Sequence, residues 1–451
     1  MGTQPPFRVI IVGGGMVGLT AAHIFSQAGI EFLILEKHET PLYSQGSTLA
    51  IWPQTFRIFD QLGLLRVVHP ILDCINVALI LSTKDGRVRI RDDTFQLIKH
   101  NHGHGLEIAH RPDIVKVLYE SLPETAKDRI ILKKCVTNTA VSDDGVTVAC
   151  ADGSTYQGSI VIGADGVHSR VRLLARALQA GKKPEDLPQD QISPYTTTYR
   201  MYHGALPILP GLTRNTRYDG TGDGVTTQLI NGRDRSWFAI YEKLDSPASK
   251  STRYTEADKM DVTKKWCHLY MAPNWTVHDV HAHRIGEDGL IDLEEGLIDE
   301  WSFQRVVMVG DAVHKLEPHS GLGYNCGVAD LVVLTNELRH MLQRDNTPST
   351  QDLETLFQAY QAKRAKDTQM MTELAMKTPR SLAWLTWRQK FMAKYVLPYF
   401  PVQKMHINGS VGPLVSKMPV LDWLEEKALP SSGIIPWKYH PASRDEMAID
   451  I

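Results

Sequence analysis

The sequence predicts an α/β fold in which a parallel sheet is assembled from distant parts of the chain and adjoins a second, β-rich region. Three observations predict it. Residues 8–36 read as strand, glycine turn, helix and strand. Residues 195–295 contain short β-prone runs broken by Gly and Pro. From 305 to 311 the chain returns to an apolar strand, and residues 322–376 then carry helical periodicity.

Composition is that of an ordinary globular protein. The 451 residues, 43% of them hydrophobic, suffice for two or three structural lobes. The formal net charge of -2 creates no strong field, so nucleic acid is not an expected partner. The five cysteines lie far apart without metal-ligand spacing, which favours reduced packing residues, no bound metal and a cytoplasmic location. No window reaches the roughly 18 apolar residues of a membrane span, so we expect none.

The first motif is a glycine turn between the strand Val9–Val12 and a helix. It matches G-x-G-x-x-G with Gly13, Gly15 and Gly18. The backbone N–H groups of such a turn, together with the helix dipole, bind a pyrophosphate. Glu36 ends the next strand, where a carboxylate accepts hydrogen bonds from a ribose with a free 2′-hydroxyl, as in FAD or NAD. The pattern therefore favours a Rossmann-type nucleotide-binding unit over a plain tight turn.

Two later motifs each follow an apolar strand. One runs from Gly163 to Arg172 and contains Asp165, and the other runs from Val309 to His314 and contains Asp311. The second is followed by Pro318, Gly321 and Gly323. Either motif alone is also compatible with an ordinary strand end and turn. Together, and in this order after the glycine turn, they resemble the fingerprint set of the flavoprotein aromatic-hydroxylase class.

The resemblance covers most of residues 7–400 and narrows to fungal FAD-dependent monooxygenases of the paxilline-pathway type, which act on indole diterpenes and meroterpenoids. The stretches that carry it are Glu36-Lys37, Arg57–Leu64, Gly163–Arg172 and Gly310–Gly323. It implies FAD as the bound cofactor, O2 and a hydrophobic small molecule as substrates, and NADPH as a co-substrate that binds transiently and leaves. It also implies a hydroxylase-type, glutathione-reductase-like FAD domain with a mixed β-sheet substrate domain and C-terminal helices.

The same resemblance assigns residues to the cofactor. Asp311 would hydrogen-bond the ribitol chain of FAD, and Asp165 would orient the arginines of its own motif. Arg111 would contact the FAD phosphates from the first turn of a helix, with a surface arginine at a helix end as the alternative. The further cofactor-binding residues implied are Lys37, Ala50, Pro318, Gly321, Gly323 and Tyr324. Ala50 and Tyr324 depart from the family pattern, which has glycine and a small residue there.

On the substrate side, Tyr218 matches a family tyrosine that faces the pocket, and Arg200 is the second candidate catalytic residue. A sheet tyrosine bonded to the backbone is the alternative reading of Tyr218. A helix beginning near residues 322–325 would point its N–H groups at the flavin, and the β-rich region 195–295 would keep water away. Electrophilic epoxidation of an alkene needs no base, so a missing catalytic residue would not argue against it.

The predicted function is an NADPH-dependent FAD monooxygenase of fungal-type secondary metabolism that epoxidises a prenyl or terpenoid alkene. Indole 2,3-oxidation and phenol hydroxylation stay open within the same class. A flavin oxidase or dehydrogenase that inserts no oxygen, and a flavin-binding protein without catalysis, are the alternatives from other classes.

We expect a discontinuous organisation. The FAD domain would comprise residues 1–75, 105–180 and 300–376, the substrate domain 76–104 and 181–299, and a helical or irregular extension 377–451. Aromatic and basic residues between 384 and 400 predict packed helices, with a weak contact at a membrane surface as the alternative. The histidine-rich segment 99–104 predicts a solvated loop rather than a metal site, and His314 is left without a role.

Overall fold

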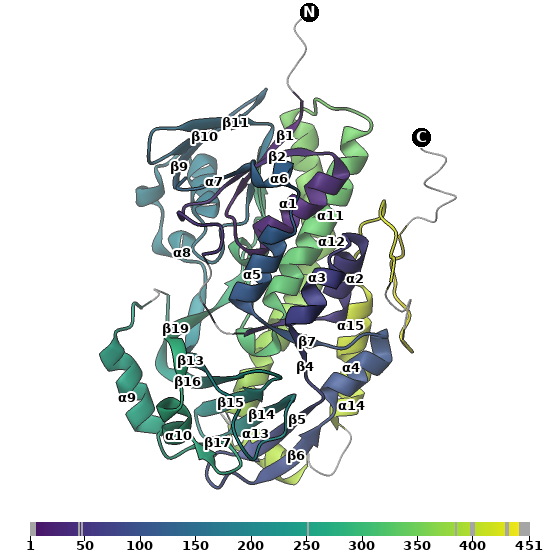
Figure 1. Ribbon diagram of the computed structural model, residues 1–451. Coiled ribbons are helices and arrows are strands. Elements are labelled where there is room, and N and C mark those ends of the chain that lie inside the picture. Colours follow the sequence, from purple (N-terminus) through teal and green to yellow (C-terminus); the bar gives the residue numbers. More distant parts are fainter. Residues whose placement is uncertain are drawn as a thin grey trace, which may run out of the picture.

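The computed structural model describes residues 6–43, 46, 48–249, 252–383, 386–396, 402–428 and 433–441. Its first layer is a six-stranded sheet in the order β20-β21-β12-β1-β2-β8, which lies in the upper half of Figure 1. All neighbouring strands are parallel except the edge pair β20 and β21. The strands are β1 (Arg8–Val12), β2 (Glu31–Leu35), β8 (Ile130–Ile131), β12 (Ile160–Gly163), β20 (Ser302–Phe303) and β21 (Val306–Met308).

The predicted βαβ unit is present. β1 is buried in four of its five positions, as expected for a strand inside a parallel sheet covered on both faces. Helix α1 (Met16–Ala28) follows the glycine turn and ends at Gly29, whose left-handed φ of 68° closes the helix. β2 then returns parallel to β1. The local pattern of apolar runs and glycines was sufficient to predict this unit.

A second layer is an eight-stranded sheet in the order β22-β19-β13-β16-β15-β14-β5-β6. β14 and β5 are parallel, and the other neighbours are antiparallel. Its strands are β5 (Val77–Ser82), β6 (Val88–Asp92), β13 (Thr196–Leu206), β14 (Thr216–Thr221), β15 (Val225–Asn231), β16 (Ser236–Ala248), β19 (Ile285–Leu297) and β22 (His314–Lys315). One face packs against α9 (Glu256–Trp266) and α10 (Val277–Ala282), so the other face is free to line a cavity.

Three small sheets complete the β structure. β3 (Thr48–Ile51), β7 (Glu107–His110) and β4 (Leu72–Cys74) form one of them, and β7 is its central strand. β11 (Thr155–Gly158), β10 (Gly145–Cys150) and β9 (Val136–Ser142) form another beside the parallel layer. β17 (Tyr270–Ala272) and β18 (Trp275–Thr276) form a hairpin.

Two long helices, α11 (Gly323–Leu342) and α12 (Thr350–Leu382), run side by side through the molecule (Figure 1). The predicted helical region 322–376 is thus two helices separated at residues 343–349. The remaining α-helices are α2 (Pro53–Gln61), α3 (Leu65–Val68), α4 (Thr94–His102), α5 (Arg111–Glu120), α6 (Glu124–Lys127), α7 (Arg170–Ala180), α8 (Gln189–Ile192), α13 (Trp387–Tyr395), α14 (Val402–His406) and α15 (Gly412–Ser416).

A buried ionic group joins the two long helices to the parallel layer. Asp330 of α11 accepts hydrogen bonds from His314 (2.5 Å), from Arg364 of α12 (2.9 Å) and from the backbone N–H of Gly310 (2.9 Å). Burial alone would raise the pKa of Asp330, but His314 and Arg364 hold it below its ordinary value. His314, which the sequence left without a role, is therefore part of the core.

Two expectations about the periphery can be compared with the structure. The segment 99–104 is not a solvated loop, because α4 continues to His102, and Asn101 and His102 are buried. Every helix in the described parts of the chain is too short or too polar to cross the hydrocarbon core of a bilayer. Of the aromatic segment 384–400, only 386–396 lies within the described residues. There, Trp387, Phe391 and Tyr395 are exposed rather than packed in the core.

Candidate functional site

The three sequence motifs meet around one cavity of about 510 Å³ between the layers. This volume is in the range of small-molecule and cofactor sites. Eleven of the predicted cofactor residues line it, namely Gly13, Gly15, Glu36, Lys37, Arg111, Asp165, Asp311, Pro318, Gly321, Gly323 and Tyr324. Segments more than 300 residues apart in the chain therefore converge on a single space, which we call the large cavity.

The glycine turn forms one end of the large cavity. Gly13 has a φ of 108°, and a Cβ there would lie 2.5 Å from the carbonyl oxygen of Ala164. Gly15 caps α1 and has nothing within 4 Å of a Cβ position, so its backbone is open to a ligand. Gly18 does not line the cavity, and its Cβ position lies 2.0 Å from the carbonyl oxygen of Gly13, so a side chain there would clash with the turn. The three glycines thus provide the turn, the open approach and the close packing that a bound pyrophosphate requires.

Glu36 stands at the end of β2, beside the glycine turn. Its Oε2 accepts the backbone N–H of Gly14 at 2.6 Å, and its Oε1 accepts the backbone N–H of His38 at 2.9 Å and the His38 ring Nδ1 at 2.5 Å. A carboxylate has about four acceptor positions, so one stays available to a ribose hydroxyl. The His38 ring stacks on Tyr43 at 3.6 Å, and both residues also line the cavity.

At the other end of the cavity, Asp311 stands next to the start of α11. Its carboxylate accepts a hydrogen bond from Lys315 at 2.6 Å, and its Oδ1 lies 3.7 Å from the Cβ position of Gly323, the first residue of α11. Burial would raise the pKa of Asp311, but the neighbouring Lys315 keeps it lowered, so this carboxylate is ionised at neutral pH. An ionised acceptor at this place fits hydroxyl groups of a ribitol chain.

Basic side chains line the large cavity at several places. Arg111 is the first residue of α5, as expected, and no described residue accepts a hydrogen bond from its side chain. The other basic residues in the lining are Lys37, His38, Lys134, His168, Arg170 and Lys315. The cavity therefore has the donors that a pyrophosphate requires, and its residues fit a flavin dinucleotide.

The expectation for Asp165 needs correction. Its carboxylate accepts no hydrogen bond from the guanidinium group of any described arginine. It accepts the Ser169 hydroxyl at 2.5 Å and the backbone N–H groups of Arg170 (2.7 Å) and Val171 (3.0 Å), so it caps the start of α7. Burial raises its pKa, and these hydrogen bonds oppose the rise. Asp165 thus shapes the wall of the cavity from the N-terminus of a helix.

Arg172 connects this motif to the Asp311 motif. Its guanidinium donates to the carbonyl oxygens of Ala312 (2.9 Å) and Val167 (2.8 Å), and it lies 5.0 Å from the ring centre of Tyr195. The Tyr195 hydroxyl in turn donates to the carbonyl oxygen of Asp311 at 3.1 Å. Tyr195 could not be predicted from a local motif, because its role depends on a contact across 116 residues.

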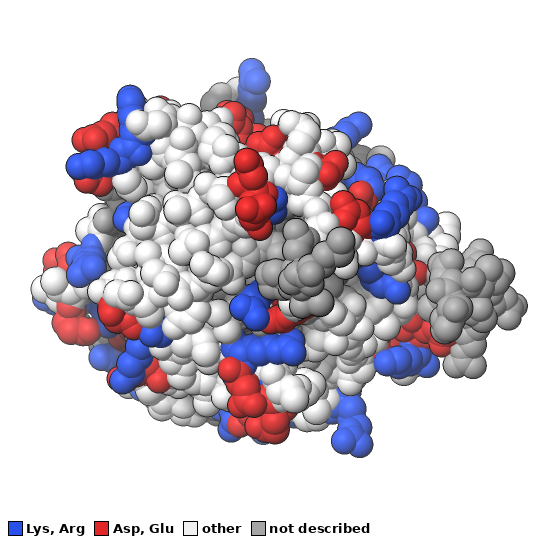
Figure 2. Space-filling view, turned by 90° about the horizontal axis from the view of Figure 1, so that it is seen from above, with Lys and Arg blue, Asp and Glu red and all other residues white. Residues whose placement is uncertain are grey.

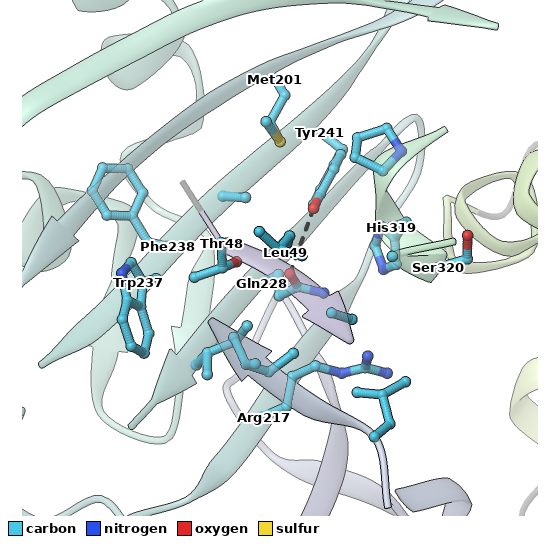
Figure 3. Close-up of a pocket in the computed structure, with 17 residues that line it drawn as sticks. Thr48, Leu49, Met201, Arg217, Gln228, Trp237, Phe238, Tyr241, His319 and Ser320 are labelled. Carbon is cyan, nitrogen blue, oxygen red and sulfur yellow. Dashed lines mark hydrogen bonds between the residues drawn. The ribbon is translucent and has the colours of Figure 1, made fainter. Parts of the chain in front are cut away.

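A second, smaller cavity of about 70 Å³ adjoins the first. Thr48, Leu49, Pro318 and Gly321 line both cavities, so the two spaces meet at β3 and at the turn before α11. Its other lining residues are Ala50, Leu106, Ile108, Met201, Arg217, Gln228, Ile230, Trp237, Phe238, Ala239, Tyr241, His319 and Ser320. The free face of the eight-stranded sheet supplies most of them (Figure 3). We call this space the small cavity.

Ala50 and Tyr324 were both expected to bind the cofactor, but their main contacts are with other parts of the protein. Ala50 lines the small cavity rather than the large one, and the Cβ position of Gly321 lies 2.4 Å from its Cβ. Tyr324 contributes to the large cavity, but its hydroxyl hydrogen-bonds Thr20 of α1 at 2.8 Å and its ring lies 6.5 Å from that of Phe59. Tyr324 is thus mainly a contact between helices.

Tyr218 does not reach the small cavity. It stands on β14 beside Arg217, which lines the cavity, and adjacent strand residues point to opposite faces of a sheet. Its hydroxyl accepts the backbone N–H of Thr213 at 3.2 Å, and its ring belongs to the core beneath α9 and α10. The expectation that Tyr218 is catalytic is therefore wrong, and it is a sheet tyrosine bonded to the backbone.

Arg200 is displaced in the same way. It adjoins Met201, which lines the small cavity, but its own side chain donates to Glu242 at 2.7 Å and lies 5.6 Å from the ring centre of Tyr254. The prediction selected the correct strand, but the residue that faces the cavity is the next one, Met201, and not Arg200. We correct it, because the side chain is held outside the cavity.

The small cavity has a polar wall without net charge. Arg217 donates to Asp219 at 2.8 Å, and Gln228 donates to the other oxygen of Asp219 at 3.0 Å. The Tyr241 hydroxyl donates to Gln228 at 3.5 Å, as the dashed line in Figure 3 shows. Because the charges of Arg217 and Asp219 cancel, the wall suits a neutral molecule.

His319 faces this wall from the turn η4 (Pro318–Ser320). Its ring centre lies 4.5 Å from that of Tyr241, and its Nε2 is 3.9 Å from Asp219. The side chain is only 1% exposed, and no described residue hydrogen-bonds either ring nitrogen. Burial lowers the pKa of His319 to about 4, against the opposing effect of Asp219, so the ring is neutral at physiological pH.

The segment with three histidines does not make a compact metal site. His104, His69 and Glu107 each offer a ligand atom, and these atoms lie within 4.8 Å of one another. The Nε2 of His104 is 3.9 Å from Glu107. Ligand atoms around a zinc ion are closer, at roughly 3.3 Å for bonds of about 2.0–2.1 Å. The absence of a metal stays a prediction.

Comparisons with known proteins agree with this geometry. The chain matches the family described as FAD binding domain over residues 7–236 and 241–375. It is 33% identical to the FAD-dependent monooxygenase srdH of Neurospora crassa, with 96% of this chain and 98% of that protein covered. It is 29% identical to the FAD-dependent monooxygenase spyC of Aspergillus fumigatus, with 88% and 84% covered.

The fold also resembles solved structures. HpxO of Klebsiella pneumoniae, complexed with FAD and uric acid, superposes with a TM-score of 0.73, at 19% identity, over 92% of this chain and 97% of that one. At this level of identity the likeness concerns the fold, which is that of an FAD-binding hydroxylase.

Proposed function

Because this chain belongs to the FAD binding domain family, among relatives that are FAD-dependent monooxygenases, we propose that it uses NADPH and O2 to insert one oxygen atom into an apolar metabolite. The reaction we favour is epoxidation of an alkene in a terpenoid, meroterpenoid or indole secondary metabolite. Among FAD-dependent monooxygenases, we propose that the chain is of the paxilline-pathway type.

One observation carries the proposal. The large cavity, with the donors for a dinucleotide, meets the small cavity along Thr48, Leu49, Pro318 and Gly321. A cofactor in the first and a substrate in the second would therefore be in contact. When bound, FAD supplies the oxidative chemistry.

The residues of the chain would hold and orient the cofactor and shield the substrate from water. Gly13, Gly15 and Arg111 would bind the pyrophosphate, and Glu36 and Asp311 would accept hydrogen bonds from ribose and ribitol hydroxyls. The N-terminal N–H groups of α11 would face the part of a bound flavin where negative charge develops. The partial positive charge of a helix N-terminus would stabilise that charge. The eight-stranded sheet lines the small cavity and would keep water away from it.

The small cavity limits which part of a substrate enters it. A volume of about 70 Å³ is about half of the roughly 150 Å³ of a cavity that binds benzene, so only one edge of a ring or the end of a prenyl unit would enter it. The larger part of a terpenoid would therefore extend beyond it. Epoxidation of an alkene needs no general base, which agrees with a wall whose charged residues are already paired.

The two layers support a division of the chain into domains. We propose residues 1–75, 105–180 and 300–376 as the FAD domain and 76–104 and 181–299 as the substrate domain. The strand order supports it, because the strands of the six-stranded sheet come from the first set, and those of the eight-stranded sheet come from the second except β22.

A labelled-oxygen experiment tests the proposal. Protein loaded with FAD is incubated with NADPH, 18O2 and a panel of prenylated indoles and prenylated phenols. We expect product that has gained a single 18O atom as an epoxide or its hydrolysis product. Label on an aromatic ring would instead indicate indole oxidation or phenol hydroxylation. Desaturated product with all label in H2O2 would indicate an oxidase, and flavin that NADPH never reduces would contradict the proposal.

A further inference from the structure

The small cavity contains a buried imidazole that no described residue hydrogen-bonds. We propose that His319 binds a neutral oxygen-bearing group of the substrate, a hydroxyl or a carbonyl, and thereby sets which carbon atoms lie against the flavin. This inference rests on the proposed function, because it assigns the small cavity to the substrate.

The burial of His319 is the first step. A neutral imidazole carries one N–H donor and one acceptor nitrogen, and its side chain here is 1% exposed. Removing such groups from water without partners is costly, so buried polar groups are nearly always hydrogen-bonded. The carboxylate of Asp219 is 3.9 Å away from Nε2, beyond hydrogen-bond distance, and already accepts from Arg217 and Gln228. A molecule in the cavity is the remaining source of a partner.

The neighbouring turn holds His319 in place. Glu317 accepts the backbone N–H of His319 at 2.9 Å, and Gly321 closes the turn with a φ of 65°. In Figure 3 the imidazole stands beside Tyr241, with Trp237 on the other side of the cavity. The ring is therefore fixed by its backbone and by Tyr241, rather than by hydrogen bonds of its own nitrogens.

The charges indicate the chemical class of the ligand. Arg217 and Asp219 neutralise each other, and His319 is itself uncharged. A carboxylate would find no unpaired cation among the residues of this wall, and burying an unpaired charge is unfavourable. The apolar lining, which includes Met201, Ile230 and Trp237, suits a hydrocarbon body. The expected ligand is a neutral, largely apolar molecule with one oxygen function.

The position of His319 connects binding to regiochemistry. It follows Pro318 directly and precedes Gly321 by two residues, and both of these line the large cavity as well. An oxygen atom held by His319 would therefore lie close to the boundary where cofactor and substrate meet. Carbon atoms a few bonds from that oxygen would be the ones presented to the flavin.

The experiment compares single-ring probes of matched shape. Protein loaded with FAD is titrated with p-cresol, p-xylene and p-toluate, and binding is measured from the change in flavin absorbance. p-Cresol and p-xylene differ by a hydroxyl in place of a methyl group, and p-toluate adds a negative charge. We expect p-cresol to bind about five- to tenfold more tightly than p-xylene, the value of one neutral hydrogen bond. We expect p-toluate to bind more weakly than p-cresol.

Two substitutions and one control locate the effect. His319→Phe should abolish the preference for p-cresol while leaving p-xylene binding within about twofold. His319→Gln, which keeps a donor and an acceptor, should retain part of the preference. The control is His102→Phe, because His102 is also buried with both ring nitrogens unpartnered but lines neither cavity. It should keep the full preference.

The inference is overturned if the unaltered protein does not prefer p-cresol, or if His319→Phe keeps the preference. It is also overturned if His319→Phe weakens p-cresol and p-xylene equally, since that result indicates a structural role. Failure of the proposed function would look different. It would appear as absence of FAD binding, NADPH oxidation or 18O insertion in the unaltered protein, whatever the ratio of probe affinities.

Discussion

At the scale of single residues, Gly13 is constrained both by its backbone conformation and by its neighbours. Its φ of 108° and the 2.5 Å separation between its Cβ position and the Ala164 carbonyl oxygen exclude a side chain. We expect Gly13→Ala to lower the FAD content of the purified protein at least tenfold, measured by flavin absorbance per chain. The control is Gly29→Ala, which also has a positive φ of 68° but open space around it. It should cost about 1 kcal/mol of stability and leave FAD binding intact. Equal loss of FAD in both variants would contradict the argument.

The burial of Glu317 leads to a prediction about how the stability of the protein depends on pH. Burial raises its pKa to about 8, whereas an unfolded chain releases this proton near the ordinary value of 4.5. Between these two values the folded protein holds one proton more than the unfolded chain, so this residue lowers stability as pH rises, by about 1.4 kcal/mol per pH unit. Glu317→Gln keeps an acceptor for the N–H of His319 and removes the titration. We expect the variant to gain stability relative to the unaltered protein from pH 5 to pH 8, measured by urea unfolding. A difference in stability between the two proteins that stays constant from pH 5 to pH 8 would contradict this prediction.

At the scale of secondary-structure elements, the contact between α11 and α12 depends on a buried ion pair. Arg364 donates to Asp330 at 2.9 Å, and their side chains are 1% and 0% exposed. We expect Arg364→Met to lower the free energy of unfolding by about 3–5 kcal/mol, because it leaves a buried carboxylate with less compensation. Its neighbour Lys363 pairs with Glu337 at the surface, and Lys363→Met should change stability by less than about 0.5 kcal/mol. Denaturant unfolding of both variants tests this, and equal effects would contradict it.

The elements also show what the sequence could predict. β1, α1 and β2 were predictable because their apolar runs and glycines are local signals. The cofactor motifs were predictable because each ends a strand of the same sheet. Tyr218 and Arg200 were chosen one residue away from the cavity-facing positions Arg217 and Met201, because the sequence does not show which face of a strand is covered. His319 was missed because its unpartnered nitrogens are evident only once the neighbouring strands are placed.

At the scale of the whole molecule, acidic and basic residues nearly balance, with 51 Asp and Glu against 49 Lys and Arg. Figure 2 shows acidic and basic side chains interspersed over the described residues of one face. This distribution agrees with the formal net charge of -2 and gives no broad field of one sign. We therefore expect recognition to depend on the two internal cavities. The large cavity lies where the two layers meet, because Val12 of β1 and Lys315 of β22 both line it.

Because the large cavity is lined by distant segments, FAD binding should stabilise the molecule as a unit. A ligand that binds only the folded state adds about 4 kcal/mol when present at 1,000 times its dissociation constant. We expect removal of FAD to lower the midpoint of thermal unfolding and readdition to restore it, with a single transition in the loaded protein. The variant Gly13→Ala should show little response to added FAD, which separates specific binding from general stabilisation. Two independent transitions in the loaded protein, or an unchanged midpoint on FAD removal, would show that the cofactor does not hold these segments together.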